Sequence, residues 1–291
     1  MTFIPLIAAP SAPHAPHAVA LLRTARLARS SKPFRARGGS DQPRCAGCRL
    51  VVSHCLCAVR PMVGTSAGVC LIMADIEALK PSNTGWLIAD VVADTFAFGW
   101  ARTEVDPALL ALLADPQWQP YVVFPGEFVA AGRMVTQLIA HNNEEAQFSA
   151  QDGTARRGVD SGNAAACKAS DPRSGGAWGP RPLFVLLDAT WPEARKMFRK
   201  SPYLDHLPVL SLASEQISRY KLRRSRRDDH FCTSEVAALC LDLAGESHAA
   251  QTLEAYLDVF THHYLRAKSQ LPAQWDGEAH ARLRELAGPQ T

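Results

Sequence analysis

The stretch LFVLLDATWPEARKMFRK, residues 183–200, is the clearest indication of fold class in this chain. Its apolar start, residues 183–187, predicts a short buried strand. An amphipathic segment follows at once, in which Thr190 stands three residues before a glutamate, the pattern of a capping box, and Pro192 lies in the first helical turn. A buried strand that runs directly into a helix is typical of a parallel α/β sheet. Asp188 is then expected at the carboxyl end of the strand.

Further apolar runs predict the rest of the sheet. Upstream runs cover residues 68–74, 95–100 and 121–124, and a downstream run covers residues 209–212. Helices are predicted at residues 84–94, from Thr233 onward, and along the apolar face of Leu253, Tyr256, Leu257, Phe260 and Tyr264. Because strands that alternate with helices pair in parallel, we expect an α/β fold with a mainly parallel sheet and flanking helices.

Length and composition indicate a globular protein. The chain has 291 residues, 47% hydrophobic and 20% charged, which suffices for one full domain core with small appendages. No apolar run reaches the roughly 18 residues of a membrane helix, so no membrane span or membrane partner is expected. The formal charge of +3 is too small for general coating of nucleic acid, so any RNA contact must come from local clusters. Nothing points to an obligate protein partner.

Three segments lack the apolar period of a folded element. Residues 1–40 contain six Arg or Lys and no acidic residue, which favours a disordered extension; a mitochondrial transit peptide or a misplaced start codon fits the same composition. Residues 141–180 change to Gly, Ser, Ala, Asn and Asp, which predicts a disordered insertion in a surface loop. Residues 271–291 are expected to form a C-terminal tail. The catalytic domain would then span residues 61–270.

Four cysteines crowd into residues 41–60, as Cys45-x2-Cys48-x6-Cys55-x-Cys57. Four thiolates at these spacings can surround a tetrahedral zinc ion, and with all four positions filled the metal would be structural. Two disulfides or an iron–sulfur cluster are the alternatives, but the chain has no secretory signal and no dense cysteine framework. We therefore expect a small N-terminal module that binds structural Zn²⁺, in a reducing compartment, the cytoplasm.

Small polar residues separate the first predicted strand from its helix, in KPSNTGW at residues 80–86. A helix N-terminus of this kind offers backbone N–H groups and a positive dipole end to an anion, here a carboxylate or an RNA phosphate. The same residues would occur if they only capped the helix. The candidate ligand-binding residues are Ser82, Asn83, Thr84 and Gly85.

Asp188 and Trp191 follow the strand predicted at residues 183–187. In open α/β sheets, ligands bind beyond the carboxyl ends of the strands, so Asp188 is placed to meet a substrate and to act as a base. The alternative is an aspartate that stabilises a helix start, with Trp191 as an ordinary core residue. The residues alone favour neither interpretation.

Two basic segments flank Asp188 along the sequence. Residues 219–227, RYKLRRSRR, combine six basic side chains with an aromatic ring, and the helix after Asp188 adds further cations. Arginine and lysine neutralise phosphates, and a tyrosine can stack on a base. A solvated charged face is the alternative. The candidate RNA contacts are Arg195, Lys196, Arg199, Tyr220, Arg223 and Arg224.

Taken in order, these motifs resemble the DTW-domain family, named for the Asp-x-Thr-Trp seen here as Asp188, Thr190 and Trp191. The resemblance covers residues 44–265 without the insertion. The matching positions are Cys45, Cys48, Cys55 and Cys57; Pro81 to Gly85; Phe124, Pro125, Gly126 and Glu127; the Asp188 motif; Tyr220, Leu222, Arg223 and Arg224; and Thr233 with Glu235. One position departs from the pattern, since Trp86 stands where an arginine is expected after the Thr-Gly pair.

The resemblance implies a tRNA-uridine aminocarboxypropyltransferase, with S-adenosyl-L-methionine as group donor and tRNA as partner. It also implies a fold related to SPOUT methyltransferases, with a knotted cofactor site. Asp188 would accept the N3 proton of uridine or position the imide, Trp191 would shape the pocket, and Thr190 belongs to the same catalytic motif. The cofactor-binding residues would be Ser82, Asn83, Thr84, Gly85, Phe124, Pro125, Gly126, Glu127, Thr233 and Glu235.

Two other functions remain open at this point. A SPOUT-type RNA methyltransferase would use the same cofactor but deliver its methyl group, and would release S-adenosylhomocysteine instead of methylthioadenosine. A non-enzymatic, zinc-bearing RNA-binding protein would bind no S-adenosylmethionine.

Overall fold

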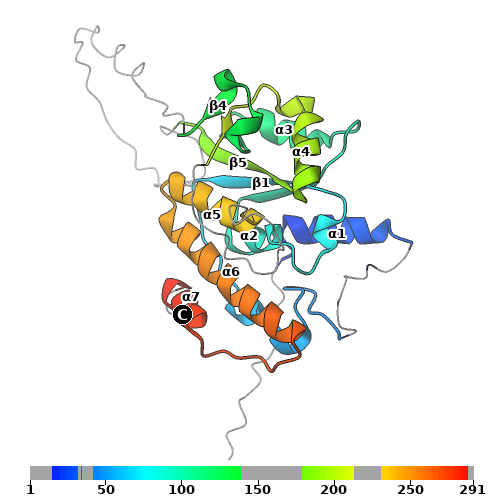
Figure 1. The fold of residues 1–291 in the computed structure, drawn as a ribbon, viewed down its shortest axis with the longest axis vertical. Helices are drawn as coiled ribbons and strands as arrows, with labels where there is room; N and C mark the ends of the chain where they lie inside the picture. The colour runs from blue at the N-terminus through cyan, green and yellow to red at the C-terminus, as the bar shows by residue number, and fades with distance from the viewer. Residues whose placement is uncertain (1–14, 32–33, 35–41, 139–178, 213–230, 288–291) are drawn as a thin grey trace, which may run out of the picture.

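A six-stranded sheet lies at the centre of the protein, and all its paired strands run parallel (Figure 1). The computed structural model describes residues 15–31, 34, 42–138, 179–212 and 231–287. The strand order is β2-β1-β5-β3-β6-β4. The strands are β1 Gly68–Met73, β2 Thr95–Gly99, β3 Trp118–Val123, β4 Met134–Val135, β5 Arg181–Asp188 and β6 Val209–Leu210. The expected α/β fold with a parallel sheet is confirmed.

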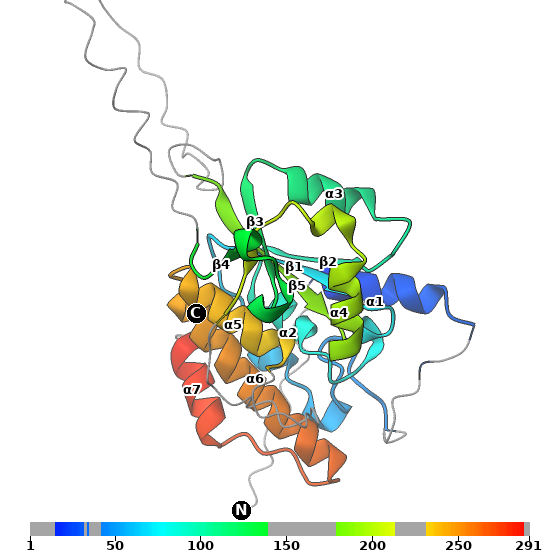
Figure 2. The ribbon, with the colours of Figure 1, turned by 45° about the horizontal axis from the view of Figure 1, so that its top comes forward.

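Helices cover both faces of the sheet (Figures 1 and 2). One face carries α1 Ala18–Ala28, α2 Gly85–Val91, α5 Thr233–Leu243 and α6 Ser247–Lys268. The other face carries α3 Pro107–Ala114 and α4 Trp191–Arg199, and α7 Glu278–Ala287 packs against α6 from outside. The protein therefore has three layers, with the sheet in the middle.

The side chains of β1 show how the two cores are divided. Val69, Leu71 and Met73 pack among the residues of α2, α5 and α6. Cys70 and Ile72 point to the other side and pack among residues of α3 and α4. All five are fully buried, as expected for a central parallel strand. Each large apolar side chain buried in this way contributes about 1.5–3 kcal/mol.

Helix α1 differs from the prediction of a disordered extension over residues 1–40. Val19 on its inner face is fully buried in the core that includes α2. Arg26 donates two hydrogen bonds to Asp75, from Nε to Oδ1 at 2.7 Å and from Nη2 to Oδ2 at 2.8 Å. The His17 ring meets the Trp86 ring edge-on at 4.5 Å. Composition alone predicts no ordered structure in this segment. The contacts that order it come from residues elsewhere in the chain, which composition does not reveal.

Two more helices and a short strand occupy positions where no element was predicted. Helix α3 has the sequence PALLALLA, which is too uniformly apolar to show a helical period. Asp106 starts it by accepting a hydrogen bond from the Ala108 N–H at 2.9 Å. Helix α7 lies in residues 271–291, which we expected to form a tail, and buries His280 and Leu283 against the rest of the protein. Strand β4 has only two residues.

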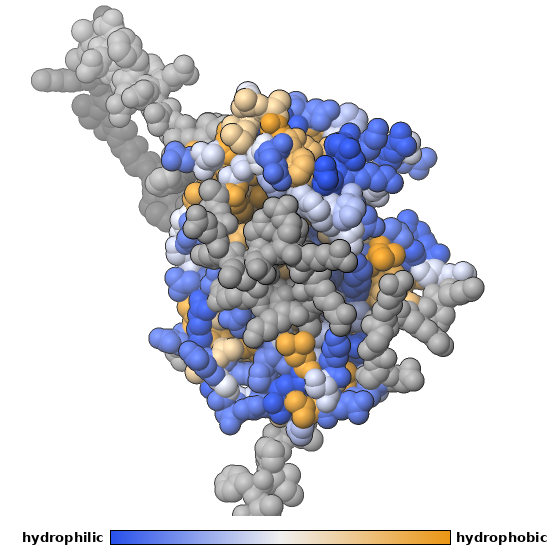
Figure 3. Space-filling model, in the orientation of Figure 1, coloured by the Kyte–Doolittle hydropathy of each residue, from blue (hydrophilic) through white to orange (hydrophobic). Residues whose placement is uncertain are grey.

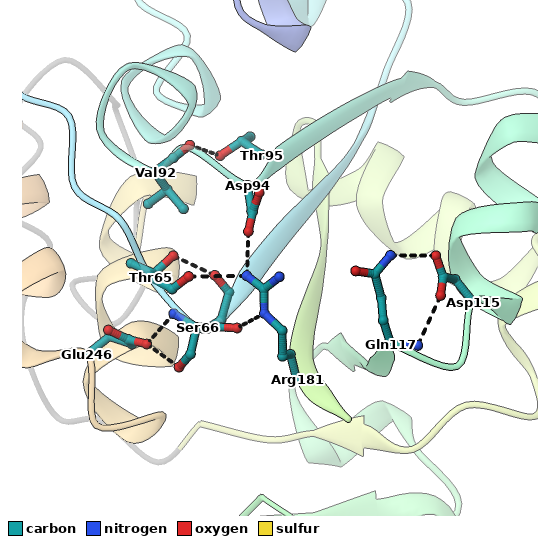
Figure 4. A network of polar contacts seen from close by, with 10 residues as sticks. Thr65, Ser66, Val92, Asp94, Thr95, Asp115, Gln117, Arg181 and Glu246 are labelled. Atoms are coloured by element: carbon teal, nitrogen blue, oxygen red, sulfur yellow. Dashed lines mark hydrogen bonds and ion pairs between the residues drawn. The ribbon is translucent and has the colours of Figure 1, made fainter. Parts of the chain in front are cut away.

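A polar network closes the edge of the sheet at which the strands begin (Figure 4). Arg181, the first residue of β5, donates hydrogen bonds to the carbonyl oxygens of Ser66 at 2.6 Å and Thr65 at 3.1 Å, just before β1. Its guanidinium also pairs with Asp94, just before β2. Glu246 accepts a hydrogen bond from the Ser66 N–H at 2.6 Å. This network lies at the edge opposite to the carboxyl edge, where ligands usually bind in parallel α/β sheets.

Within the described ranges, the structure has no helix with the length and hydropathy that crossing a bilayer requires. The face shown in Figure 3 is largely hydrophilic, with apolar residues in separate patches. The insertion predicted at residues 141–180 falls almost entirely outside the described residues. The knot implied by the family resemblance stays a prediction, because residues 213–230, between β6 and α5, also lie outside them.

Candidate active site and metal centre

The carboxyl ends of β1 and β5 form the point where the chain changes direction across the sheet. From β1 the chain continues to β2 on one side, and from β5 it continues through α4 to β6, beyond β3 on the other side. The two strands are neighbours, with Met73 opposite Asp188 in the register. Loops that leave adjacent strands in opposite directions open a crevice, the usual ligand position in parallel α/β sheets.

Asp188 joins three separate segments at this point. Its Oδ2 accepts a hydrogen bond from Asn83 Nδ2 at 2.6 Å, and its Oδ1 accepts one from Thr233 Oγ1 at 2.6 Å. A Cβ atom added at Gly85 would lie 2.6 Å from Asp188 Oδ2, so only glycine allows this approach. Hydrogen bonds to a charged group contribute about 1.5–3 kcal/mol each. The carboxylate therefore holds the loop before α2 and the start of α5 against the end of β5.

Asp188 is fully buried at this position. Its side chain has no exposed surface, and both of its oxygens already accept hydrogen bonds. A base that takes a proton from uridine must come within hydrogen-bond reach of that proton, so the role of Asp188 as the proton acceptor stays a prediction. The role that its contacts show is to hold the surrounding loops through Asn83 and Thr233.

The loop at residues 80–85 combines capping with contacts to Asp188. Asn83 Oδ1 accepts a hydrogen bond from the Trp86 N–H at 3.0 Å, which caps α2, while its Nδ2 faces Asp188. Asn83, Thr84 and Gly85 are buried, and Ser82 is half-buried. The capping interpretation is thus correct for Asn83, and Ser82 is the member of the set with the most accessible surface.

The start of α5 is organised in a similar way. Glu235 accepts a hydrogen bond from the Cys232 N–H at 2.7 Å, the return contact of a capping box. Thr233 and Glu235, predicted to contact the cofactor, are both largely buried. The structure brings Thr233 to Asp188 and uses Glu235 to cap the helix, and their contact with a cofactor stays a prediction.

Aromatic rings form one wall beside the end of β5. Phe124 stacks on Phe198 at 4.2 Å and lies nearly parallel to Trp191 at 5.6 Å. Phe128 meets Trp191 edge-on at 5.6 Å. Trp191 keeps part of its surface accessible, whereas Phe124 is buried. Stacked and edge-on aromatic pairs of this kind stabilise the packing of these side chains.

The remaining predicted residues of this region have simpler positions. Thr190 and Glu193 form the capping box that the sequence predicts for α4, with the Thr190 N–H donating to Glu193 Oε2 at 3.1 Å. Gly126 N–H donates to Ser211 Oγ at 3.0 Å, which ties the loop after β3 to the end of β6. Pro125 and Glu127 are exposed at the rim. Ser211 could not be predicted as a partner, because a lone serine after a strand has no distinctive pattern.

The basic residues of α4 lie on its solvent side. Arg195, Lys196 and Arg199 are all exposed. The Arg195 guanidinium lies 4.6 Å from the centre of the Phe128 ring, so this cation stands directly beside the aromatic wall. Lys196 Nζ lies 5.7 Å from the centre of the Trp100 ring. Tyr220, Arg223 and Arg224, the other predicted RNA contacts, lie outside the described residues.

The four predicted metal ligands come together in space. One sulfur from each of Cys45, Cys48, Cys55 and Cys57 lies within 4.8 Å of all the others. Individual sulfur pairs are 3.4 to 3.7 Å apart. Tetrahedral zinc with Zn–S bonds of about 2.3 Å requires sulfurs roughly 3.8 Å apart, so the donor set fits zinc. The four cysteines can therefore hold a metal ion.

Contacts within the cluster shift the pKa values of three of its thiols in opposite directions. A hydrogen bond from the Cys48 thiol, with others from the neighbouring cysteines, lowers the pKa of Cys55 to about 2. The contact with Cys55 raises the pKa of Cys48 to about 12, and the contact with Cys48 raises the pKa of Cys57. The Leu56 N–H also donates to Cys48 Sγ at 3.4 Å. His54 is not part of the set, because its Nε2 lies 3.0 Å from the Leu271 carbonyl oxygen. A zinc ligand at His54 in place of one of the four cysteines is therefore not supported.

Comparison with known proteins agrees with the resemblance. The sequence model of the DTW domain matches residues 42–265. The chain is also 40% identical over 63 residues to tRNA-uridine aminocarboxypropyltransferase 2 of Drosophila melanogaster. That match covers 22% of this chain and 25% of the relative, so the chain spans about a quarter of the relative's length. No solved structure matches this chain.

Proposed function

The chain belongs to the DTW-domain family, and from this premise we propose that it is a tRNA-uridine aminocarboxypropyltransferase. The proposed reaction moves the 3-amino-3-carboxypropyl group of S-adenosylmethionine to N3 of a uridine in tRNA. The name of the partly matching relative supports the same activity. The observation that carries the proposal is the pair of hydrogen bonds to Asp188, which joins the loop before α2 and the start of α5 at the carboxyl edge of the sheet.

This pair of hydrogen bonds suits a site that must hold its ligand in one orientation. S-adenosylmethionine, when bound, supplies an electrophilic carbon on its sulfonium, and methylthioadenosine leaves as the new carbon–nitrogen bond forms. Three carbons on the same sulfur compete, so the protein decides the product by which carbon it aims at the nucleophile. Loops fixed by buried charge-assisted hydrogen bonds provide the required rigidity.

In the proposed site the residues have separate tasks. Asp188 holds Asn83 and Thr233 in place and does not itself contact the uracil. Trp191, partly exposed in the aromatic wall, is placed to contact a base or the adenine ring. Ser82, the half-buried member of the candidate set Ser82 to Gly85, would bind the carboxylate of the methionine moiety. The N3 proton of uridine leaves to solvent or to a group at the rim, where Glu127 is exposed.

RNA would approach over α4. Arg195, Lys196 and Arg199 present three cations on the exposed side of this helix. The guanidinium of Arg195 lies over the Phe128 ring, which belongs to the aromatic wall. Cations that hold the backbone next to an aromatic surface that receives a base are a common arrangement for single-stranded or splayed-out nucleotides. The four-cysteine module would hold structural zinc away from the reacting atoms.

Product analysis tests the proposed function. The full chain is incubated with unmodified tRNA and S-adenosylmethionine, and the digested nucleosides are analysed by mass spectrometry. We expect 3-(3-amino-3-carboxypropyl)uridine in the tRNA and methylthioadenosine in equal amount. S-adenosylhomocysteine with a methylated nucleoside would show a methyltransferase instead. If the chain binds tRNA but neither modifies a nucleoside nor binds S-adenosylmethionine, it is a non-enzymatic RNA-binding protein.

A further inference from the structure

Arg49 has an unusual position in the four-cysteine module. It follows Cys48 directly and has a φ of 65°, in the left-handed region that favours glycine or asparagine. Its N–H donates to the Cys45 carbonyl oxygen at 2.9 Å, which closes the turn between the first two cysteines. The residue is only 2% exposed. A buried arginine in this conformation needs contacts that offset both the strain and the lost hydration.

The guanidinium of Arg49 reaches out of the module into the loop at residues 80–85. Nη1 donates to the Lys80 carbonyl oxygen at 2.7 Å, and Nη2 donates to the Asn83 carbonyl oxygen at 3.0 Å. The group also lies 4.2 Å from the centre of the Trp86 ring. A planar fork that spans two carbonyl oxygens fixes both their distance and their direction, which a lysine ammonium cannot do.

These contacts continue directly to the centre of the proposed site. Asn83 receives Arg49 on its backbone carbonyl and donates from its side chain to Asp188 Oδ2 at 2.6 Å. Asp188 in turn accepts from Thr233. A short series of buried polar contacts thus joins the turn between Cys45 and Cys48 to the carboxyl edge of the sheet.

We propose that Arg49 is a positioning residue through which metal binding at the four cysteines orders the loop at residues 80–85. Metal would fix the turn that carries Arg49, since Cys45 and Cys48 flank it and are both candidate ligands. The fixed guanidinium then holds the carbonyl oxygens of Lys80 and Asn83. The consequence for S-adenosylmethionine affinity rests on the proposed function, whereas the ordering of the loop does not.

Linkage makes the coupling measurable from either end. If metal strengthens ligand binding at the loop by some factor, the ligand must strengthen metal binding by the same factor. Loss of Arg49 should bring that factor close to one, so that metal and ligand bind independently of each other. A residue that only stabilised the fold would weaken both sites without changing their dependence on each other.

The first test follows the loop itself by hydrogen exchange. The amides of Asn83 and Trp86, which donate to Lys80 O and to Asn83 Oδ1, report on the loop. In zinc-loaded Arg49→Ala we expect both amides to exchange at least tenfold faster than in the wild type, and Arg49→Lys should lie between the two. Arg44→Ala is the matched control, because Arg44 donates to the Arg49 carbonyl oxygen and stays within the module.

Metal content and thermal unfolding of each variant are measured alongside. Unchanged exchange in folded, zinc-loaded Arg49→Ala would overturn the proposal, and so would equal acceleration in Arg44→Ala. If Arg49→Ala does not fold, exchange of the same two amides is measured in Arg49→Lys and in the metal-stripped wild-type protein. Exchange at the rate of the zinc-loaded wild type in both samples would also overturn the proposal.

The second test measures S-adenosylmethionine binding by calorimetry with and without zinc. In the wild type we expect zinc removal to weaken binding at least tenfold. In Arg49→Ala, binding should already be weak and should change less than twofold on zinc removal, while the KM for tRNA stays near its wild-type value. An undiminished effect of zinc in Arg49→Ala would contradict the coupling. Absence of S-adenosylmethionine binding to the wild type would refute the proposed function and leave the exchange experiment to decide the role of Arg49.

Discussion

Asn83 and Asp188, 105 residues apart in the chain, are joined by a buried hydrogen bond of 2.6 Å from Nδ2 to Oδ2. The bond links the loop after the first strand of the sheet to the end of β5, where the direction of the chain connections reverses. Because Asp188 also accepts from Thr233, a single carboxylate organises all three segments around the candidate site.

Replacing this carboxylate should affect stability as well as activity. In Asp188→Asn, one of the two donors, Asn83 Nδ2 or Thr233 Oγ1, would face an NH₂ group and lose its acceptor. We expect a loss of about 1–3 kcal/mol in the free energy of unfolding, measured with urea, together with loss of transfer activity. Asp75→Asn is the control, since that carboxylate is largely exposed and should cost at most about 1 kcal/mol. Wild-type stability in Asp188→Asn would show that the buried hydrogen bonds do not organise the site.

Gly85 tests how closely the loop approaches Asp188. A Cβ atom at this position would lie 2.6 Å from Asp188 Oδ2, so Gly85→Ala must displace the carboxylate or the helix start. We expect a loss of about 1–3 kcal/mol in the free energy of unfolding. Gly64→Ala is the matched control, because nothing lies within 4 Å of its added Cβ. Equal stability of the two variants would mean that the loop has room that the structure does not show.

Metal content tests the four-cysteine module. The purified chain should contain one zinc per chain, and Cys57→Ser should lose it, because three thiolates and a weakly acidic hydroxyl hold zinc much less tightly. Cys240→Ala is the control, since Cys240 is buried in the core away from the cluster and should leave the zinc content unchanged. Plasma emission spectrometry measures both. Full zinc content in Cys57→Ser would remove this residue from the ligand set.

Acid should destabilise the packing of α6 on α7. Burial, with added repulsion from His280, lowers the pKa of His263 to about 3, so the folded protein holds this ring neutral. In the unfolded chain the same ring protonates near pH 6.5. The contribution of His263 to the free energy of unfolding is therefore complete above about pH 6.5 and is lost as the pH falls toward 3. Between pH 7 and 5, the free energy of unfolding of His263→Phe should therefore fall less steeply than that of the wild type.

The exposed His206 offers the control for this slope. The variant His206→Phe should keep the wild-type dependence on pH, measured by urea unfolding at each pH. Parallel slopes for His263→Phe and the wild type would show that His263 titrates normally.

The cations of α4 should contribute to RNA binding through phosphate contacts. Replacing Arg195, Lys196 and Arg199 together with alanine should weaken tRNA binding and flatten the plot of log K against log salt, by up to about 0.7–0.9 per lost contact. The control replaces the exposed Lys268 and Arg284 on α6 and α7, on the opposite side of the sheet, and should leave the slope unchanged. An identical slope in both variants would show that tRNA does not approach over α4.

The sequence was sufficient to predict the elements with clear local patterns. The strand that ends at Asp188 and the capping box of Thr190 and Glu193 are where the pattern places them. The four cysteines converge as their spacing predicts. Each of these features depends on residues close together in the chain, so local propensity and spacing determine them.

Features that depend on distant partners could not be predicted. Asp188 is buried because Asn83 and Thr233 cover it, and neither has a local pattern that reveals this contact. Helix α1 is ordered by docking onto α2 and the loop that holds Asp75, although its composition is typical of disorder. Arg49 follows Cys48 in the sequence, yet only the fold shows that it reaches Lys80 and Asn83.

Hydrogen exchange with and without S-adenosylmethionine tests most directly whether the ligand binds at the carboxyl edge of the sheet. We predict slower exchange on binding in residues 81–86, 124–128, 189–191 and 232–235, which surround the ends of β1, β3 and β5 and the start of α5. Residues 64–67 and 179–181, at the opposite edge beside the Arg181 network, should not change. Protection at that opposite edge would show that the ligand binds elsewhere, and no protection in any part of the chain would show that it does not bind.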